Sequence, residues 1–209
     1  MIDLPRAPDT TWWVSPTSRA PLLSRPHDRA AAVGRLHLFT EDGFPEVDLV
    51  AGERRQGGRL WLRVRQPQKP RAIAGWAPAQ TFSKPQAVHT RFVVDRATER
   101  AALFRDGSVI WRGRVGVGKS STPTPPGDYW IREKFTVTGD GLYGTRAFGT
   151  SDYSPFETDW PKGGIVGIHG TDQPGLIPGD PSHGCIRIRN SAIERLYPLM
   201  PVGTPIVIH

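Results

Sequence analysis

The chain of 209 residues contains a single cysteine, Cys185. A lone thiol excludes an internal disulfide framework, so other interactions must hold the fold together. The chain also lacks any apolar run of about eighteen residues, which excludes a membrane-spanning helix of ordinary length. The apolar stretch at residues 1–4 is too short for the core of a signal peptide and is broken by Pro5. We therefore expect a protein that is not integral to a membrane, and that is either cytosolic or begins after a removed leader.

Acidic residues are outnumbered, and the formal net charge is +7. A basic balance favours anionic partners, such as nucleic acid, an anionic membrane or an acidic wall polymer. The basic residues, however, are spread along the chain without a block or a nucleic-acid motif. We therefore predict a solvated basic surface and no nucleic-acid partner.

Glycine and proline are abundant, which favours short strands and turns over long helices. Residues 1–20 are polar and interrupted by proline, and we expect a leader or linker there, although Trp12 and Trp13 fit a docked segment or a first strand. Residues 21–86 contain short apolar pieces. Trp61-x-x-Val64 followed by Gly75-Trp76-Ala77-Pro78 resembles the closing hairpin of a bacterial Src-homology-3-like barrel. Such a barrel would bind or position the cell wall, although core packing alone also explains the two tryptophans.

Residues 87–209 form the second expected domain, which begins with three strands at residues 91–94, 101–105 and 108–115. Asp106-Gly107 between the last two is a strong hairpin signal. A further strand is expected at 128–131 and a last one at 205–208, and Ser191-x-x-Glu194 predicts a capped helix that Pro198 should kink or end. Residues 133–163 show little periodicity and are expected to form a lid or cleft loop. Its candidate lining residues are Tyr143, Phe148, Tyr153, Phe156 and Trp160.

Two segments of this second domain carry reactive side chains. His169 ends the apolar run Ile165-Val166-Gly167-Ile168, and Ser182-His183-Gly184-Cys185-Ile186-Arg187 follows after a loop rich in proline. A thiolate is a strong nucleophile that needs a base or a positive charge nearby to form near neutral pH. If the loop folds back, Cys185 lies beside His169. Gly184 then admits substrate close to the backbone, and the N–H groups of Gly184 and Cys185 could face a developing oxyanion.

These segments resemble the L,D-transpeptidase catalytic domain, also called the YkuD family. The matching residues are Ile168-His169-Gly170 and Ser182 to Arg187, with support from 122–127 and 203–208, and the resemblance covers about residues 88–209. It implies a mainly β fold: an L,D-transpeptidase-type β-sandwich with one short C-terminal helix, preceded here by the small Src-homology-3-like β-barrel.

The resemblance also implies a reaction that needs no cofactor. Cys185 would attack a peptidoglycan stem peptide at the carbonyl of its third residue and release the terminal D-alanine, and an amine of an acceptor stem would resolve the thioester into a 3→3 cross-link. His169 would be the base, oriented by the carbonyl of Gly170. Arg187 suggests a clamp for a substrate carboxylate, Ser182 and Gly170 are placed with the substrate, and His183 and Gly184 are structural or on the oxyanion side. Acylation by carbapenems, a role in cell shape and export to the periplasm or cell wall are implied as well.

Three alternatives remain open from the residues. Water in place of the amine would make the protein an L,D-carboxypeptidase, and an idle thiol would leave a wall-binding protein without enzymatic activity. His169, His183 and Cys185 with Asp172 or Asp180 could also hold a metal ion. The absence of a second cysteine or of paired histidine spacing speaks against the metal site, and we expect none.

Overall fold

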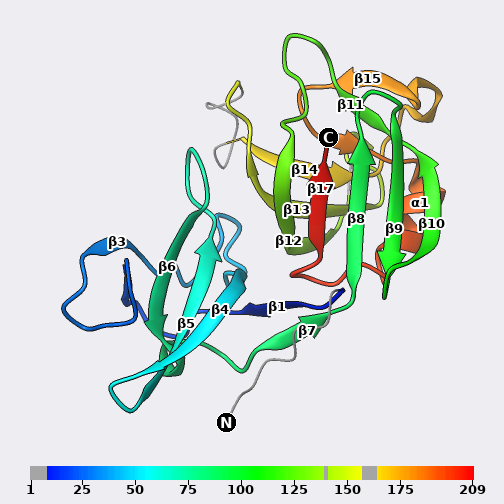
Figure 1. Cartoon of the computed structure of the whole chain (residues 1–209). Coiled ribbons are helices and arrows are strands. Elements are labelled where there is room, and N and C mark those ends of the chain that lie inside the picture. The colour runs from blue at the N-terminus through cyan, green and yellow to red at the C-terminus, as the bar shows by residue number, and fades with distance from the viewer. Residues whose placement is uncertain (1–8, 139–140, 157–163) are drawn as a thin grey trace. The chain divides into compact units, whose positions relative to one another are not determined.

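The computed structural model describes residues 9–138, 141–156 and 164–209, which separate into two compact units, Met1–Val88 and His89–His209 (Figure 1). Both units are mainly β, and the described part of the chain holds one α-helix. No helix in the described ranges is both long and apolar enough to cross a membrane.

The first unit contains one seven-stranded sheet in the order β3-β2-β6-β5-β4-β1-β7. Its buried core includes Val14, Leu22, Leu62 and Val64. The elements are β1 (Thr11–Val14), β2 (Pro21–Leu23), β3 (Ala32–Arg35), β4 (Asp48–Gln56), β5 (Arg59–Gln66), β6 (Ile73–Pro78), the short 3-10 helix η1 (Ala79–Thr81) and β7 (Gln86–Val88).

Part of the expected leader is a strand of this sheet. β1 carries Trp12 and Trp13 and pairs with both β4 and β7. The two tryptophans near the expected hairpin lie on neighbouring strands, because β5 pairs with β6 in a register that sets Arg63 opposite Trp76. Trp61 is buried and Trp76 is half-buried.

The second unit contains a ten-stranded sheet in the order β10-β9-β8-β17-β12-β13-β14-β16-β11-β15. Figure 1 shows the C-terminal strand β17 between β12 and β8. The elements are β8 (Thr90–Asp95), β9 (Arg100–Arg105), β10 (Ser108–Arg114), β11 (Gly116–Gly118), β12 (Gly127–Thr136), β13 (Arg146–Tyr153), β14 (Ile165–His169), η3 (Pro174–Leu176), β15 (Gly179–Ser182), β16 (Ile186–Arg187), α1 (Asn190–Leu196) and β17 (Pro205–Ile208).

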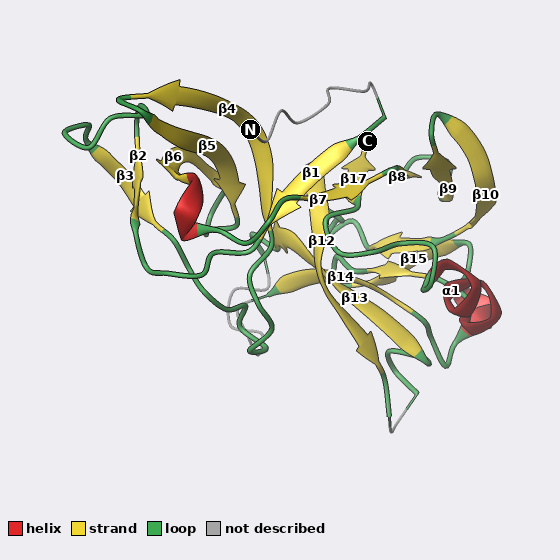
Figure 2. Cartoon of the chain, turned by 90° about the horizontal axis from the view of Figure 1, so that it is seen from below, coloured by secondary structure: helices red, strands yellow, loops and turns green. Residues whose placement is uncertain are grey.

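The long strand β12 joins the two halves of this sheet. Its first residues pair with β17 and its later ones with β13, and the register shifts between Ile131 and Glu133. Such an irregularity bends a strand. Seen from below in Figure 2, the sheet curves rather than lying flat. Phe92 and Leu103 from one half and Phe148, Ile168 and Ile186 from the other share one core, as expected for a β-sandwich.

Most of the strands expected in residues 87–209 are present, and the hairpin between β9 and β10 turns at Asp106 and Gly107. Both residues have positive φ, +48° and +76°, which is the geometry that an Asp-Gly turn favours. The final strand and the end of the helix before Pro198 also agree with the sequence.

Two expectations were wrong in part. Residues 133–163 are not one continuous loop, because β12 extends to Thr136 and β13 occupies 146–153. The predicted cap at Ser191 is also absent: α1 begins at Asn190, with Arg189 at the cap position and no side-chain capping hydrogen bond. The side chain of Asn190 instead accepts a hydrogen bond from the N–H of Thr171, 2.9 Å away, so it ties the helix to the loop that follows β14.

Candidate active site

The two reactive segments meet because β14 and β16 are parallel neighbours. Ile168 is paired with Ile186, and both are fully buried in the core. Side chains alternate between the faces of a strand, so the residues before and after each isoleucine point to the opposite face. His169 and Arg187, which are also paired, therefore share a face with Cys185, which comes directly before β16.

Cys185 as a whole is half-buried, and its sulfur lies against the backbone of β14. The N–H of Gly167 points to Sγ at 3.4 Å. Burial raises the pKa of the thiol, and the Gly167 N–H and the positive charge of Arg187 oppose that rise without cancelling it. The free protein therefore holds Cys185 as a neutral thiol near pH 7.

His169 is nearly buried, with 3% of its surface exposed. Its Nδ1 lies 2.6 Å from the carbonyl oxygen of Gly170. A carbonyl oxygen only accepts hydrogen bonds, so Nδ1 carries the proton and Nε2 keeps a free lone pair. Burial lowers the pKa of the imidazole to about 4, the Gly170 contact partly offsets this, and the charge of Arg187 adds to the decrease. The imidazole is therefore a neutral base at physiological pH.

Gly167 lies close to both the thiol and the imidazole. A Cβ atom at this position would lie 3.8 Å from Cδ2 of His169 and 3.9 Å from Sγ of Cys185. Both side chains thus come within 4 Å of the position that a Cβ of residue 167 would take, and the glycine leaves this position unoccupied.

The segment before Cys185 is a tight turn held by Ser182. Its Oγ donates to the carbonyl oxygen of Cys185 at 2.6 Å and accepts from the N–H of Gly184 at 3.1 Å. Gly184 has a φ of +121°, which residues with a side chain rarely adopt. The Gly184 N–H is therefore used within the turn, which supports a structural role for this residue.

His183 lies on the surface beside this turn. Its Nε2 is 2.9 Å from Nζ of Lys119, from which it accepts a hydrogen bond. No group of three histidine, cysteine or acidic side chains within the described ranges is arranged to hold a metal ion.

A cavity of about 230 Å³ opens over these residues, and it is lined by His169, Ser182, His183, Cys185 and Arg187 together with Leu142, Tyr143, Ser154 and residues 164–166. The rings of Tyr143 and His169 are in edge-to-face contact, with 4.8 Å between their centroids and 74° between their planes. Arg187 adds a positive charge, with Nη1 3.4 Å from Oε1 of Gln173.

The other candidate lining residues lie elsewhere. Phe148 is buried in the core, the Tyr153 ring lies 5.9 Å from the guanidinium of Arg132, and Phe156 is exposed. Trp160 lies outside the described residues.

Sequence reasoning missed three residues of this region. In the sequence, Gly167 is only one member of an apolar run, Lys119 carries no motif, and Asn190 stands one residue before the predicted cap. An asparagine beside a helix start is a known capping signal, but here its partner is a loop 19 residues away in the sequence, which no local pattern predicts.

Comparisons with known proteins match this part of the chain. The model of the L,D-transpeptidase catalytic domain family, YkuD, matches residues 89–208. YqjB of Bacillus subtilis, which is named as an L,D-transpeptidase, is 30% identical over 125 residues, a match that covers 56% of this chain and 69% of YqjB.

Two solved structures are also similar. The catalytic domain of the E. faecium L,D-transpeptidase is 27% identical, with 57% of this chain and 96% of that chain covered and a TM-score of 0.43. Bd1075 of Bdellovibrio bacteriovorus is 27% identical, with 58% of this chain covered and a TM-score of 0.47, and this chain spans only 47% of it. The family match alone covers more than half of the sequence, and this chain belongs to the YkuD family of L,D-transpeptidase catalytic domains.

Proposed function

We propose that this protein cross-links peptidoglycan stem peptides through a thioester on Cys185. The proposal rests on one observation: a neutral thiol and a neutral imidazole line the same cavity. The carbonyl oxygen of Gly170 holds the proton on Nδ1 of that imidazole. This arrangement suits a base that acts when substrate arrives, rather than a thiolate that is always present.

In the first half-reaction, Sγ attacks the carbonyl carbon of the third stem residue while Nε2 of His169 takes the thiol proton. The C–N bond to the terminal D-alanine then breaks, His169 returns the proton to the leaving amine, and a thioester remains. In the second half-reaction, the amine of another stem attacks the thioester and gives a proton to His169. The 3→3 amide forms, and the thiol is regenerated with that proton.

Other residues of the cavity supply binding. The guanidinium of Arg187 can hold a substrate carboxylate through two parallel hydrogen bonds. Tyr143 covers His169 and limits the access of water. The N–H of Cys185 is our candidate donor to the oxyanion, because the N–H of Gly184 already donates to Ser182.

We also propose that residues 21–86 form a Src-homology-3-like module that binds or positions the wall, and that the enzyme acts outside the cytoplasmic membrane, in the periplasm or cell wall. Support for the module comes from the antiparallel pairing of β5 with β6 around Trp61 and Trp76. Export follows from the location of the substrate.

The decisive experiment incubates the purified protein with a disaccharide-tetrapeptide and follows the products by mass spectrometry. We expect a cross-linked dimer lacking one D-alanine, and no product from Cys185→Ala. His169→Asn should lower the rate by about 10² to 10⁴, the usual contribution of general acid–base catalysis, while His89→Asn, at an exposed histidine of the same unit outside the cavity, serves as the matched control and should keep its rate. A product that is tripeptide alone would replace this proposal with the carboxypeptidase reaction.

A carbapenem provides a second test of the nucleophile, because its reactive carbonyl needs no acceptor stem. The intact mass should increase by one carbapenem in the parent protein and stay unchanged in Cys185→Ala. An unmodified parent mass would count against Cys185 as the acyl carrier.

A further inference from the structure

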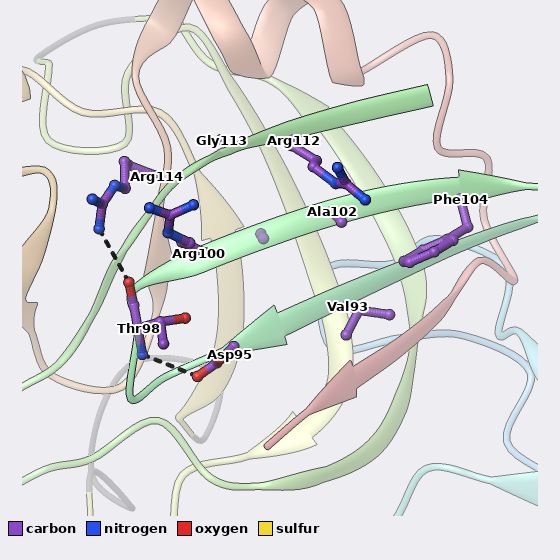
Figure 3. Close-up of a pocket in the computed structure, with 10 residues that line it drawn as sticks. Val93, Asp95, Thr98, Arg100, Ala102, Phe104, Arg112, Gly113 and Arg114 are labelled. Atoms are coloured by element: carbon purple, nitrogen blue, oxygen red, sulfur yellow. Dashed lines mark hydrogen bonds between the residues drawn. The ribbon is translucent and has the colours of Figure 1, made fainter. Parts of the chain in front are cut away.

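A second and larger cavity, of about 490 Å³, lies on strands β8, β9 and β10 of the same unit (Figure 3). Its lining shares no residue with the candidate active site. In the order of the sheet, β17, β12 and β13 stand between β8 and β14. The cavity is therefore a separate feature of the catalytic unit.

The register of the three strands decides which side chains line it. On β9, Ala101 and Leu103 are buried in the core, so Arg100, Ala102 and Phe104 point to the opposite face. Ala102 is paired with Val93 of β8 on one side and with Arg112 of β10 on the other. The result is a floor of Val93, Ala102 and Phe104 with arginines along it.

Arg100, Arg112 and Arg114 line the cavity, and Arg100 lies directly opposite Arg114. Arg114 is the cross-strand partner of Arg100, and Arg112 follows two residues away on the same face of β10. Like charges directly opposite each other destabilise a strand pair. The pairing therefore has a cost that a bound anion would remove.

Carboxylates of the protein offset only part of this charge: three arginines and one acid, Asp95, line the cavity, which leaves a net charge of +2. Asp95 is paired with Arg100 across β8 and β9, but its Oδ1 accepts from the N–H of Thr98 at 3.0 Å. Arg114 donates to the carbonyl oxygen of Thr98 at 3.2 Å, as drawn in Figure 3. Over the described parts of the chain, Arg100, Arg112 and Arg114 form no ion pair.

We propose that this groove binds the oxyanion groups, carboxylate or phosphate, of an anionic glycan chain. Guanidinium groups match both kinds of oxyanion through paired N–H donors, and three of them along one groove suit a ligand with repeated charges. Val93 and Ala102 offer an apolar surface for the nonpolar face of a sugar. The one aromatic ring of the floor, Phe104, is already covered by Arg91 at 5.1 Å, which disfavours base stacking. The choice of a wall glycan as the natural ligand rests on the proposed function.

The binding test uses the full chain with two probes, polygalacturonate for carboxylates and a phosphomannan for phosphates, in titration calorimetry at low salt. Arg100→Gln/Arg112→Gln should weaken binding at least about tenfold, since a hydrogen bond to a charged group commonly contributes that factor or more. The matched control is Arg63→Gln/Arg195→Gln, which removes the same charge from exposed positions outside the groove. The probe that shows the larger loss identifies which oxyanion the groove takes.

A second measurement separates binding from structure. Arg100→Gln alone should leave the melting temperature unchanged or raise it, because it removes the repulsion with Arg114. The paired variant should also raise KM for intact peptidoglycan while leaving kcat/KM for a soluble disaccharide-tetrapeptide unaltered.

Equal losses in the groove and control variants, binding to neither probe, or equally tight binding of single-stranded DNA would overturn the proposal. These outcomes do not depend on the reaction. A protein that cross-links normally but binds neither probe refutes the groove alone, and a protein that binds but does not cross-link refutes the proposed function alone.

Discussion

Cys185 and His169 both rest in their neutral forms, because burial raises the pKa of the thiol and lowers that of the imidazole to about 4. A pair of this kind differs from a preformed thiolate and imidazolium, in which the nucleophile is charged before substrate binds. In the proposed reaction, the thiol proton of Cys185 therefore moves to His169 during the attack on the substrate. The free enzyme should accordingly be protected from unspecific alkylation and oxidation near neutral pH.

We predict that iodoacetamide labels Cys185 more slowly than it labels glutathione at pH 7, and that the rate keeps rising above pH 9. Arg187→Gln should slow labelling several-fold at pH 8, because the charge of Arg187 lowers the pKa of the thiol. The measurement is the rate of mass increase across a pH series, and Cys185→Ser, which lacks the only thiol, is the blank. A plateau reached below pH 7 would reveal a preformed ion pair.

Asp152 is a second buried titratable group of the unit. It is 5% exposed, and its Oδ2 has no hydrogen-bond partner among the described residues. Burial raises the pKa of this carboxyl to about 7, although hydrogen bonds with Tyr129 and the N–H of Tyr153 oppose the rise. The folded state therefore binds this proton more tightly than the unfolded chain does.

The two buried groups act on stability in opposite directions. The contribution of Asp152 to the free energy of unfolding is fully present below about pH 4 and is lost as the pH rises through about 7. The contribution of His169 to the free energy of unfolding is present above about pH 6.5 and is lost as the pH falls toward 4.

We predict that Asp152→Asn raises the free energy of unfolding at pH 8 by at least about 1 kcal/mol, and that the gain vanishes near pH 4. The variant should then show the acid sensitivity of His169, which Asp152 partly cancels in the parent protein. Urea titrations at pH 4, 6 and 8 measure this, with the exposed Asp180→Asn as control. A gain of equal size at every pH would mean that packing, and not ionisation, is responsible.

Residues 141–145, which precede β13, are held beside the candidate active site by close backbone packing. Gly144 has a φ of +64°, and a Cβ there would collide with Oδ1 of Asn190 and lie 2.5 Å from Cα of Gly170. The neighbouring Tyr143 contacts His169. The start of α1, the loop after His169 and the loop of Tyr143 therefore form one packed element.

We expect Gly144→Ala to cost about 1–3 kcal/mol of stability, since it adds backbone strain to a contact that cannot relax. It should also slow carbapenem acylation by displacing Tyr143 from His169. Gly175→Ala is the matched control, because a Cβ there meets no atom within 4 Å. Thermal melting and acylation rates check both effects, and equal behaviour of the two variants would contradict this account.

The elements that sequence reasoning identified share a local cause. The turn at Asp106-Gly107 needs two residues that tolerate positive φ, and β8 and β9 alternate between buried and exposed positions. The sequence does not predict β13, because this strand buries polar side chains: Thr150, Ser151 and Asp152 lie inside the unit. A strand of that kind shows neither apolar alternation nor an apolar run, so its sequence is read as a loop.

Each of the two units has a hydrophobic core of its own, with Phe92 and Ile168 in one and Val14 and Leu62 in the other. Every residue of the candidate active site lies in the second unit. The match to the catalytic domain family covers the same part of the chain.

We therefore predict that residues 89–209 alone fold cooperatively and are acylated by a carbapenem at a rate within about twofold of the full chain. Because a unit with its own core can fold by itself, circular dichroism melting and intact mass against time are sufficient measurements. An unfolded fragment, or one that is folded but inert, would show that the first unit completes the site.

The sequence by itself determined the chemistry: one thiol, a histidine at the end of an apolar strand, and a glycine beside the thiol that allows a φ of +121°. These are local requirements, and residue type and spacing express them directly. Only the tertiary structure decided the protonation states, the proton on Nδ1 of His169, the contact of Asn190 with Thr171 and the arginine groove. Burial and the pairing of strands distant in the chain set these properties, and neither is written in the local sequence.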